Sequence, residues 1–378
     1  MKLNRPVSCG DVTIGGGAPV SIQSMTNTDT RDIRATTAQI AALVAEGCDI
    51  VRCAAPDMDS AAAFADIRTE LRARGLTVPL VADIHFDHRL AVAAIDAGAD
   101  KVRINPGNIG NDDKLRAVVQ RAMDARIPIR VGVNGGSLER DIFDAYGGPT
   151  PEALAASALR NIERVASMGF EDIVVSVKSS DACTCVAALR ILSVRTDFPL
   201  HIGVTEAGAG DRALVKSAIG MGPLLVDGIG DTMRVSLTGD PVDEVRAARD
   251  ILASVGMLPG AIDVISCPTC GRCKVNLPCV ADGVRKAARA IEADNVIRAR
   301  RERSTSAHDP FVVAVMGCAV NGPGEAAHAD VGVACGDGVA VLFEGGVKVG
   351  TVGEAEIISA LTERIIAGIR KRGLARKE

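Results

Sequence analysis

The chain has 378 residues and a formal net charge of −4, and its 47% hydrophobic and 24% charged residues are the balance of a globular protein, which excludes disorder for most of its length. Aromatic residues make up only 2%. Single-stranded nucleic acids are held by aromatic stacking and basic surfaces, so we expect no nucleic-acid partner. No apolar run could span a bilayer and the N-terminus shows no apolar signal core, so we expect a cytoplasmic protein without a membrane partner.

Short apolar runs alternate with longer, helix-like segments through the first part of the chain, and segments such as 36–47 and 150–169 repeat apolar residues at helical spacing. Eight strand-then-helix units within about 250 residues are typical of a TIM barrel. A doubly wound open sheet is the alternative, but its glycine-rich phosphate loop would follow the first strand. The glycines at 15–17 precede that strand and predict the turn of a small hairpin. The eight expected strands are 19–25, 48–54, 78–84, 100–106, 127–133, 171–177, 199–205 and 231–237.

The pattern changes beyond a Gly/Pro stretch at 256–261. Strands and helices there no longer alternate regularly, which predicts a small α+β module with its own core. We expect strands at 261–267, 311–318, 330–336 and 338–346, with helices near 281–300 and 353–371. The predicted fold is therefore α/β, with an N-terminal TIM (β/α)8 barrel for substrate binding (residues 1–258) and a small α+β domain (residues 259–378).

The strongest chemical signal is the segment CPTCGRCKVNLPC, which contains Cys267, Cys270, Cys273 and Cys279, together with Cys318 in GCAVNGPGE. Closely spaced thiolates of this kind bind either structural zinc or an iron–sulfur cluster. The C-x2-C-x2-C spacing resembles that of ferredoxins and would select the first three cysteines with Cys318. The other six cysteines are expected to fill the core: Cys9, Cys48, Cys53, Cys183, Cys185 and Cys335.

Charged and polar residues stand at the carboxyl ends of the expected strands, where TIM barrels place their catalytic groups. Five of them are cations, and converging like charges need an anion to hold them together. Since Arg gives forked contacts suited to phosphate, we infer a substrate with more than one phosphate. Glu206 is either a counter-ion or a proton-transfer group. The cations are Arg52, Arg103, Arg130, Lys178 and Arg234, and the other candidates are Asp83, His85, Asn134 and Ser236.

Several long motifs resemble those of the 4-hydroxy-3-methylbut-2-enyl diphosphate synthase family of the methylerythritol phosphate route to isoprenoids. They are QSMTNTDT (23–30), ADIHFD (82–87), VRINPGNIG (102–110), TEAG (205–208), DGIGDTMRVSLTGDP (227–241), SCPTCGR (266–272) and GCAVNGPGEA (317–326). The match runs in order through both domains. The resemblance implies the two-electron reductive ring opening of 2-C-methyl-D-erythritol 2,4-cyclodiphosphate, with electrons delivered by a [4Fe–4S] cluster in the C-terminal domain.

The resemblance also implies roles for individual residues. The cluster ligands would be Cys267, Cys270, Cys318 and Glu325, which replaces the spacing-based choice of Cys273 by a carboxylate. Cys273 and Cys279 depart from the family pattern. Glu206 would be the acid/base or charge-stabilising residue. The substrate would be held by Arg52, Asp83, His85, Arg103, Arg130, Asn134, Lys178, Arg234 and Ser236.

The family resemblance further implies a homodimer in which the cluster domain of one chain caps the barrel of the other, with flavodoxin or ferredoxin as the electron donor. Two alternatives use the same residues differently. One is a TIM-barrel enzyme that acts on a sugar phosphate without redox chemistry and holds zinc with its cysteines. The other is a non-catalytic electron carrier, against which the row of functional groups at eight strand ends argues.

Overall fold

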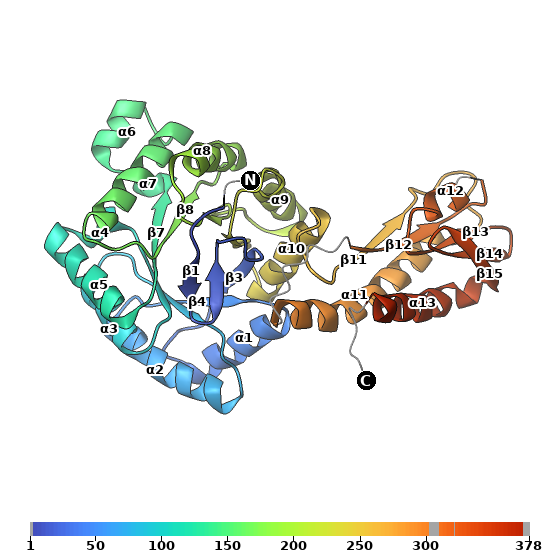
Figure 1. Cartoon of the computed structure of the whole chain (residues 1–378), viewed down its shortest axis with the longest axis horizontal. Coiled ribbons are helices and arrows are strands. Elements are labelled where there is room, and N and C mark those ends of the chain that lie inside the picture. The colour runs from blue at the N-terminus through green and yellow to red at the C-terminus, as the bar shows by residue number, and fades with distance from the viewer. Residues whose placement is uncertain (1–2, 302–309, 321, 373–378) are drawn as a thin grey trace. The chain divides into compact units, whose positions relative to one another are not determined.

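The computed structural model describes residues 3–301, 310–320 and 322–372, and for residues 294–301 it describes the backbone alone (Figure 1). Contacts divide the chain into two compact units, Met1–Ile251 and Leu252–Glu378. This division falls within helix α10 (Pro241–Ser254), a little before the predicted boundary near residue 258. In the part of the chain that the structure describes, no helix combines the length and apolar character needed to cross a membrane.

The first unit contains eight parallel strands in the order β8-β7-β6-β5-β4-β3-β10-β9. A parallel bridge from Val175 in β8 to Leu200, next to β9, joins the two ends of this order. The sheet is therefore closed, and the predicted TIM barrel is confirmed. Its strands are β3 (Ser21–Met25), β4 (Ile50–Ala54), β5 (Leu80–Asp83), β6 (Lys101–Ile104), β7 (Ile129–Asn134), β8 (Ile173–Lys178), β9 (His201–Ile202) and β10 (Thr232–Met233).

A helix follows each barrel strand, and Figure 1 shows these helices around the strands. Several begin at an Asp, Asn or Thr whose side chain accepts a hydrogen bond from a backbone N–H of the first turn, which satisfies an otherwise unpaired donor. The outer helices are α1 (Ile33–Ala45), α2 (Met58–Ala73), α3 (His88–Asp96), α5 (Asp112–Ala125), α7 (Pro151–Ala166), α8 (Ala182–Arg195), α9 (Gly210–Val226) and α10, with the short α4 (Pro106–Ile109), η1 (Gly135–Ser137) and α6 (Arg140–Tyr146) in the loops.

A hairpin of β1 (Val7–Cys9) and β2 (Val12–Ile14) precedes the barrel. Its buried side chains share a core cluster with Ile50, Val81 and Val174 from three barrel strands, so the hairpin packs against the barrel. The predicted hairpin is present, but its turn lies between Cys9 and Val12 and contains Gly10, whose φ is +56°. The glycines at 15–17 follow the second strand, so their placement in the turn was wrong.

The second unit is a five-stranded mixed sheet in the order β11-β12-β13-β14-β15, parallel up to β13 and antiparallel beyond it. Side chains of α11 and α13 share a core with Val313 and Val315, whereas Ala326 of α12 packs with Ala314 and Met316 on the opposite face. The predicted α+β module is confirmed. Its elements are β11 (Ile262–Ser266), α11 (Leu277–Arg301), β12 (Phe311–Met316), α12 (Gly322–Ala326), β13 (Val331–Cys335), β14 (Val339–Glu344), β15 (Val347–Gly353), η2 (Glu354–Glu356) and α13 (Ile357–Lys371).

Strand β15 was missed by the sequence prediction. It lies at the edge of the sheet, and its burial pattern is largely exposed. Its residues VKVGTVG include Gly350 and Gly353, and glycine weakens the strand signal. Pairing with β14 determines the conformation of this segment, and a local sequence pattern does not report that pairing.

Candidate active site

The polar residues predicted at the strand ends lie in or directly after the barrel strands. Arg52, Arg103 and Arg130 lie within β4, β6 and β7, whereas Asp83, Asn134 and Lys178 are the last residues of β5, β7 and β8. His85, Glu206, Arg234 and Ser236 belong to the segments that follow β5, β9 and β10. Because the carboxyl ends of parallel strands meet at one end of a TIM barrel, these residues belong to a common barrel mouth.

Asp83 connects three of the predicted residues. Its carboxylate lies 3.4 Å from Nε2 of His85, 3.3 Å from Nη1 of Arg103 and 3.9 Å from Nε of Arg52. Burial disfavours the ionised form of Asp83, but the charge of Arg52, the hydrogen bond from His85 and the charge of Arg103 hold its pKa well below its usual range. The carboxylate is therefore ionised at neutral pH and orients two guanidinium groups.

Asn134 adds a neutral contact to the same network. In the amide orientation that satisfies both of its ends, its oxygen accepts from Nη2 of Arg103 at 3.1 Å and its nitrogen donates to the carbonyl of Val133 at 3.2 Å. A Cβ atom at Gly132 would lie 2.8 Å from Nε of Arg103. The missing side chain at Gly132 therefore leaves room for the Arg103 guanidinium inside the barrel.

Arg130 and Lys178 are buried cations of a different kind. Arg130 is 1% exposed, and its Nε and Nη1 have no hydrogen-bond partner among the described residues. Burial, followed by the charges of neighbouring cations, lowers the pKa of Arg130 and of Lys178 well below their ordinary values. A Cβ atom at Gly203 would lie 3.1 Å from Nζ of Lys178, so this glycine leaves room for the ammonium group.

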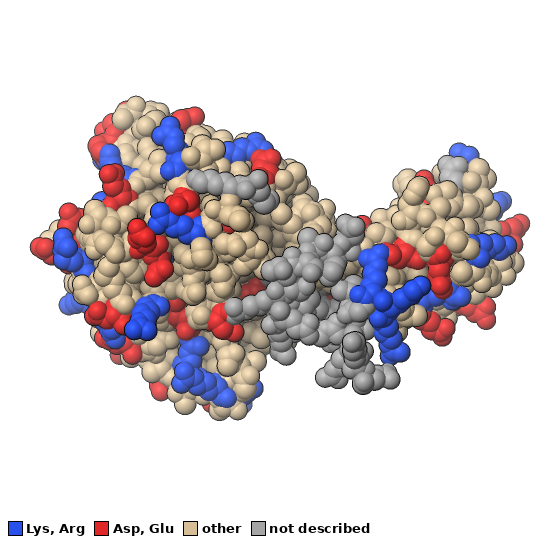
Figure 2. Space-filling view, in the orientation of Figure 1, with Lys and Arg blue, Asp and Glu red and all other residues tan. Residues whose placement is uncertain are grey.

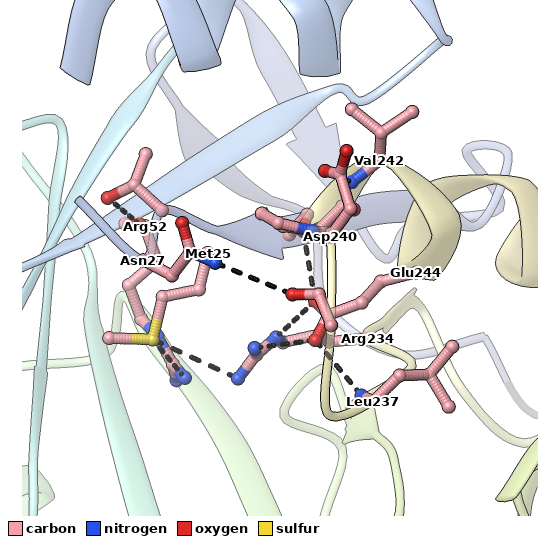
Figure 3. Close-up of polar contacts among 12 residues, drawn as sticks. Met25, Asn27, Arg52, Arg234, Leu237, Asp240, Val242 and Glu244 are labelled. Carbon is pink, nitrogen blue, oxygen red and sulfur yellow. Dashed lines mark hydrogen bonds and ion pairs between the residues drawn. The ribbon is translucent and has the colours of Figure 1, made fainter. Parts of the chain in front are cut away.

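Arg234 is paired with Glu244 of α10. Its Nε and Nη2 donate to the two carboxylate oxygens at 3.1 and 3.0 Å (Figure 3). The prediction that five cations gather in one mouth is thus refined, because three of them are paired: Arg52 and Arg103 with Asp83, and Arg234 with Glu244. Among the described residues, these two carboxylates form the ion pairs of the five basic groups, and the excess of basic groups favours binding of an anion with more than one negative charge.

The excess of positive charge at the barrel mouth is enclosed within the protein. On the face of the first unit seen in Figure 2, Lys and Arg side chains are interspersed with Asp and Glu. Arg52 (7%), Arg103 (7%) and Lys178 (8%) are, in contrast, almost fully enclosed. In an enclosed site, electrostatic attraction to an anion is screened much less than at the surface.

Glu206 stands apart from this network. It is exposed, and no hydrogen bond or ion pair joins its carboxylate to another described residue. Its φ is +53°, whereas only two other described residues besides glycines have a positive φ, Arg126 and Thr269. Arg126 is the residue that caps the end of α5. A left-handed backbone at a residue such as Glu206 costs on the order of 1–3 kcal/mol and often marks a functional loop.

The cysteine segments of the second unit are joined through Gly317. The backbone N–H of Gly317 donates to Sγ of Cys267 at 3.3 Å, and the N–H of Lys274 donates to the Gly317 carbonyl at 3.1 Å. A Cβ atom at Gly317 would lie 2.6 Å from Sγ of Cys273. The loop that contains Cys267 and Cys273 therefore packs directly against the segment that leads to Cys318.

The predicted metal ligands are only partly assembled. Cys270 is exposed, as is Glu325 in the first turn of α12, whereas Cys267 and Cys318 are half-buried. Within the described ranges, no three His, Cys, Asp or Glu side chains are grouped closely enough to hold a metal ion. The donor set nevertheless fits an iron–sulfur cluster chemically, because thiolates are its usual ligands. The loop is also strained, with φ of +28° at the β-branched Thr269.

Some predictions about individual residues were wrong or incomplete. Cys183 is exposed at the start of α8 and does not fill the core, whereas the other five cysteines outside the two motifs are buried. Glu244 was missed, although an acidic residue in the first turn of the helix after the last barrel strand was a usable signal. Lys101 and His201, both fully buried, were also missed as interior polar groups. Lys101 lies two residues before Arg103, on the same face of β6.

The fold and the mouth define a TIM-barrel protein with an enclosed group of basic side chains at the carboxyl ends of its strands, followed by an α+β module with thiols on two adjoining loops. The family model described as "GcpE TIM-barrel domain" matches residues 4–249, and the one described as "GcpE protein C-terminal domain" matches residues 263–367. The chain therefore belongs to the GcpE family, and the family resemblance seen in the motifs is confirmed.

Curated relatives match nearly the whole chain. The chain is 48% identical over 364 residues to a protein of Caldanaerobacter subterraneus subsp. tengcongensis (96% of this chain, 97% of the relative). It is 49% identical over 366 residues to one of Geobacter sulfurreducens (96% and 98%), and 49% identical over 377 residues to one of Acidithiobacillus ferrooxidans (100% and 97%). Each relative is named 4-hydroxy-3-methylbut-2-en-1-yl diphosphate synthase (flavodoxin). Among solved structures, a dihydropteroate synthase of Vibrio fischeri reaches a TM-score of only 0.46 at 10% identity (66% of this chain, 98% of that chain).

Proposed function

We propose that this chain catalyses the reductive dehydration and ring opening of 2-C-methyl-D-erythritol 2,4-cyclodiphosphate to (E)-4-hydroxy-3-methylbut-2-enyl diphosphate. The substrate takes up two electrons and protons and releases water. Residues 1–258 bind the substrate, and residues 259–378 hold the redox centre. The names of the relatives, at 48–49% identity over almost the full length, support this reaction.

The observation that carries the proposal is the enclosed excess of cations at the barrel mouth. Five cations face two carboxylates, and the free Nε and Nη1 of Arg130 require acceptors. A cyclic diphosphate supplies several oxygen acceptors and negative charges in one compact molecule. Guanidinium groups bind such oxygens through forked, charge-assisted hydrogen bonds, so the mouth matches this class of substrate.

The side chains of the mouth have different roles in binding the substrate. Arg52, Arg103, Arg130, Lys178 and Arg234 bind the phosphates, and Asn134, His85 and Ser236 are further hydrogen-bonding partners. Asp83 does not bind phosphate; it fixes the guanidinium groups of Arg52 and Arg103. Binding of the anion favours the charged form of Lys178, because negative charge opposes the effect of the surrounding cations. Glu206, which is exposed, moves a proton at the substrate oxygen that leaves as water.

The redox centre is a [4Fe–4S] cluster held by Cys267, Cys270, Cys318 and Glu325. When bound, it supplies single electrons to the substrate. Cys267 is already oriented by the Gly317 N–H, a donor that stabilises thiolate and tunes the potential of such centres. A carboxylate is a weaker ligand of this soft site than a thiolate, so Glu325 is the ligand most readily replaced.

The electron donor is flavodoxin, as the relatives' names indicate for those proteins, with ferredoxin as the alternative. The active form is a homodimer in which the cluster domain of one chain caps the barrel of its partner. The substrate ligands and the cysteines lie in separate units of the chain, and in this dimer the cluster domain of one chain would lie next to the substrate bound by the other. A closed site would also keep water away from reactive intermediates.

The test is to purify the protein without oxygen, measure iron and sulfide, and assay the cyclic diphosphate with reduced flavodoxin. We expect brown protein with a broad visible absorption that bleaches on reduction, and formation of the linear diphosphate. Colourless protein with stoichiometric zinc and no turnover would instead favour the non-redox enzyme on a sugar phosphate.

A further inference from the structure

We propose that Glu244 is a positioning residue of the substrate site, which holds Arg234 so that one edge of its guanidinium faces the barrel mouth. The inference rests on the proposed function, because it assigns Arg234 to phosphate binding. Glu244 lies on α10, outside the barrel strands, and is 3% exposed. Glu244 is not among the site residues predicted from the sequence.

The Glu244 carboxylate is fully occupied by donors of the protein. Oε1 accepts from Nη2 of Arg234 at 3.0 Å and from the Leu237 N–H at 3.1 Å. Oε2 accepts from Nε of Arg234 at 3.1 Å (Figure 3). It also accepts from Oγ of Ser24 at 3.0 Å. With two hydrogen bonds on each oxygen, this carboxylate has no role left as a ligand of the substrate. Its contacts instead fix one guanidinium and the chain around it.

The opposite edge of the Arg234 guanidinium points towards the sulfur of Met25, which Arg52 also contacts. Nη1 of Arg234 lies 3.8 Å from Sδ of Met25, and the same sulfur accepts from Nε and Nη2 of Arg52 at 3.1 and 2.9 Å (Figure 3). A thioether is a weak acceptor. The donors of both guanidinium groups therefore remain available to a stronger acceptor such as a phosphate oxygen, and they converge on one point from two sides of β3.

Arg52 and Arg234 are two cations that repel each other at this short range. Burial lowers the pKa of Arg52 to about 10; the charge of Asp83 acts to raise this pKa, and the charge of Arg234 acts to lower it. Glu244 offsets the repulsion on the side of Arg234 that faces away from Arg52. Without this carboxylate, Arg234 would lose its bidentate partner and swing away from Arg52. Loss of Glu244 should therefore weaken phosphate binding although Glu244 does not touch the substrate.

Glu244 also fixes the segment between β10 and α10. Its bond to the Leu237 N–H lies next to Ser236, a predicted substrate ligand. The segment is held further by the Asp240 side chain, which accepts from the Val242 N–H at 2.9 Å, and by Asn27, which donates to the Gly239 carbonyl at 3.4 Å. The loop is thus anchored at several points, and the bond to Glu244 is the one that couples it to Arg234.

The experiment compares Glu244→Gln with the wild-type holoenzyme, purified anaerobically with matched iron and sulfide content, in an assay of 2-C-methyl-D-erythritol 2,4-cyclodiphosphate. We expect KM to rise at least tenfold and kcat to change less than threefold, because an amide places a donor opposite the Arg234 donors. Glu244→Asp keeps the buried charge, so it should raise KM less, and it serves as the second variant if the amide prevents folding. Glu46→Gln is the matched control, since Glu46 pairs with Arg249 and Arg246 of the same helix. It should lower Tm and leave KM unchanged.

A double-mutant cycle with Arg234→Gln gives the deciding result. If Glu244 acts through Arg234, the double variant should have a KM within twofold of that of Arg234→Gln alone. Additive effects on KM, or an unchanged KM in Glu244→Gln and Glu244→Asp with only a lower Tm, would overturn the proposal. Absence of turnover by the wild-type holoenzyme would instead count against the proposed function, so the two failures are distinguishable.

Discussion

The barrel mouth and the cysteine loops differ in how far the fold alone determines their geometry. In the mouth, Asp83 and Glu244 are buried and hold three guanidinium groups in defined directions. In the second unit, Cys270 and Glu325 are exposed, and the sulfur of the half-buried Cys267 accepts a hydrogen bond from the Gly317 N–H. The barrel mouth is therefore organised by strand pairing before anything binds. A thiolate site gains much of its order from ligation, because metal binding is coupled to folding.

The largest effect is expected for Cys318→Ser, which tests the less organised of the two sites. Loss of one thiolate should abolish the cluster, because Cys318 lies on the segment that Gly317 joins to the Cys267 loop. Visible absorption, iron content and turnover should all be lost. The barrel mouth should be unaffected, so calorimetric binding of the cyclic diphosphate should persist.

Cys183→Ser is the control for that change, since Cys183 is an exposed thiol at the start of α8 in the barrel unit. It should retain colour and activity. An intact cluster spectrum in Cys318→Ser would contradict the ligand assignment, and loss of diphosphate binding in the same variant would contradict the independence of the two sites.

Glu206→Gln tests a predicted barrel residue that has no hydrogen bond or ion pair to the other described residues of the mouth. Because its carboxylate has no partner among the described residues and its backbone is strained, we expect a chemical role rather than a structural one. Turnover should fall about 100-fold or more, the range for losing a general acid or base, with little change in Tm or substrate binding. Glu163→Gln, an exposed residue of α7, should behave as wild type. Near-normal kcat in Glu206→Gln would reduce Glu206 to a counter-ion.

The sequence predicted the barrel site better than the cysteine site, for a physical reason. Strand ends in a TIM barrel converge by topology, so identifying eight strands was sufficient to bring Arg52, Asp83, Arg103 and Lys178 together. The position of Glu244 in the first turn of α10 marked it as a candidate, but its role depends on the contact between α10 and the end of β3, and the sequence pattern does not identify that partner. The choice between Cys273 and Glu325 as ligand was open for a related reason, since spacing places both near the same loops but does not give their orientation.

The pH dependence of substrate affinity should sharpen the description of the mouth as a preformed cationic site. Burial and the nearby Arg130, Arg52, Arg234 and Arg103 lower the pKa of Lys178 in the free protein. A bound anion raises that pKa again, so binding above the free pKa takes up a proton. Affinity should therefore be highest below that pKa and fall as pH rises through it, by up to about tenfold per pH unit.

Lys178→Met isolates this contribution. The variant should bind the cyclic diphosphate more weakly, and the part of the pH dependence that comes from Lys178 should disappear, whereas ionisation of the substrate itself affects both proteins equally. Isothermal titration in buffers of different ionisation enthalpy measures the proton uptake directly. Equal uptake by wild type and variant would show that Lys178 is already charged in the free mouth.

The smallest effect is expected for Cys273→Ser, which decides between the ligand set implied by the family and the one favoured by spacing. Sγ of Cys273 donates to the Val275 carbonyl at 3.3 Å and lies beside Gly317, and the partly buried Cys273 packs against the core cluster of the second unit. These contacts make Cys273 a packing residue of the loop, so its replacement by the slightly smaller Ser should lower Tm modestly and leave absorption and turnover unchanged. Glu325→Gln in parallel should alter the spectrum, because it removes a charged ligand. Loss of the cluster in Cys273→Ser together with an unaltered spectrum in Glu325→Gln would assign the fourth position to the thiol, and the second unit would then resemble a ferredoxin more closely than the family pattern implies.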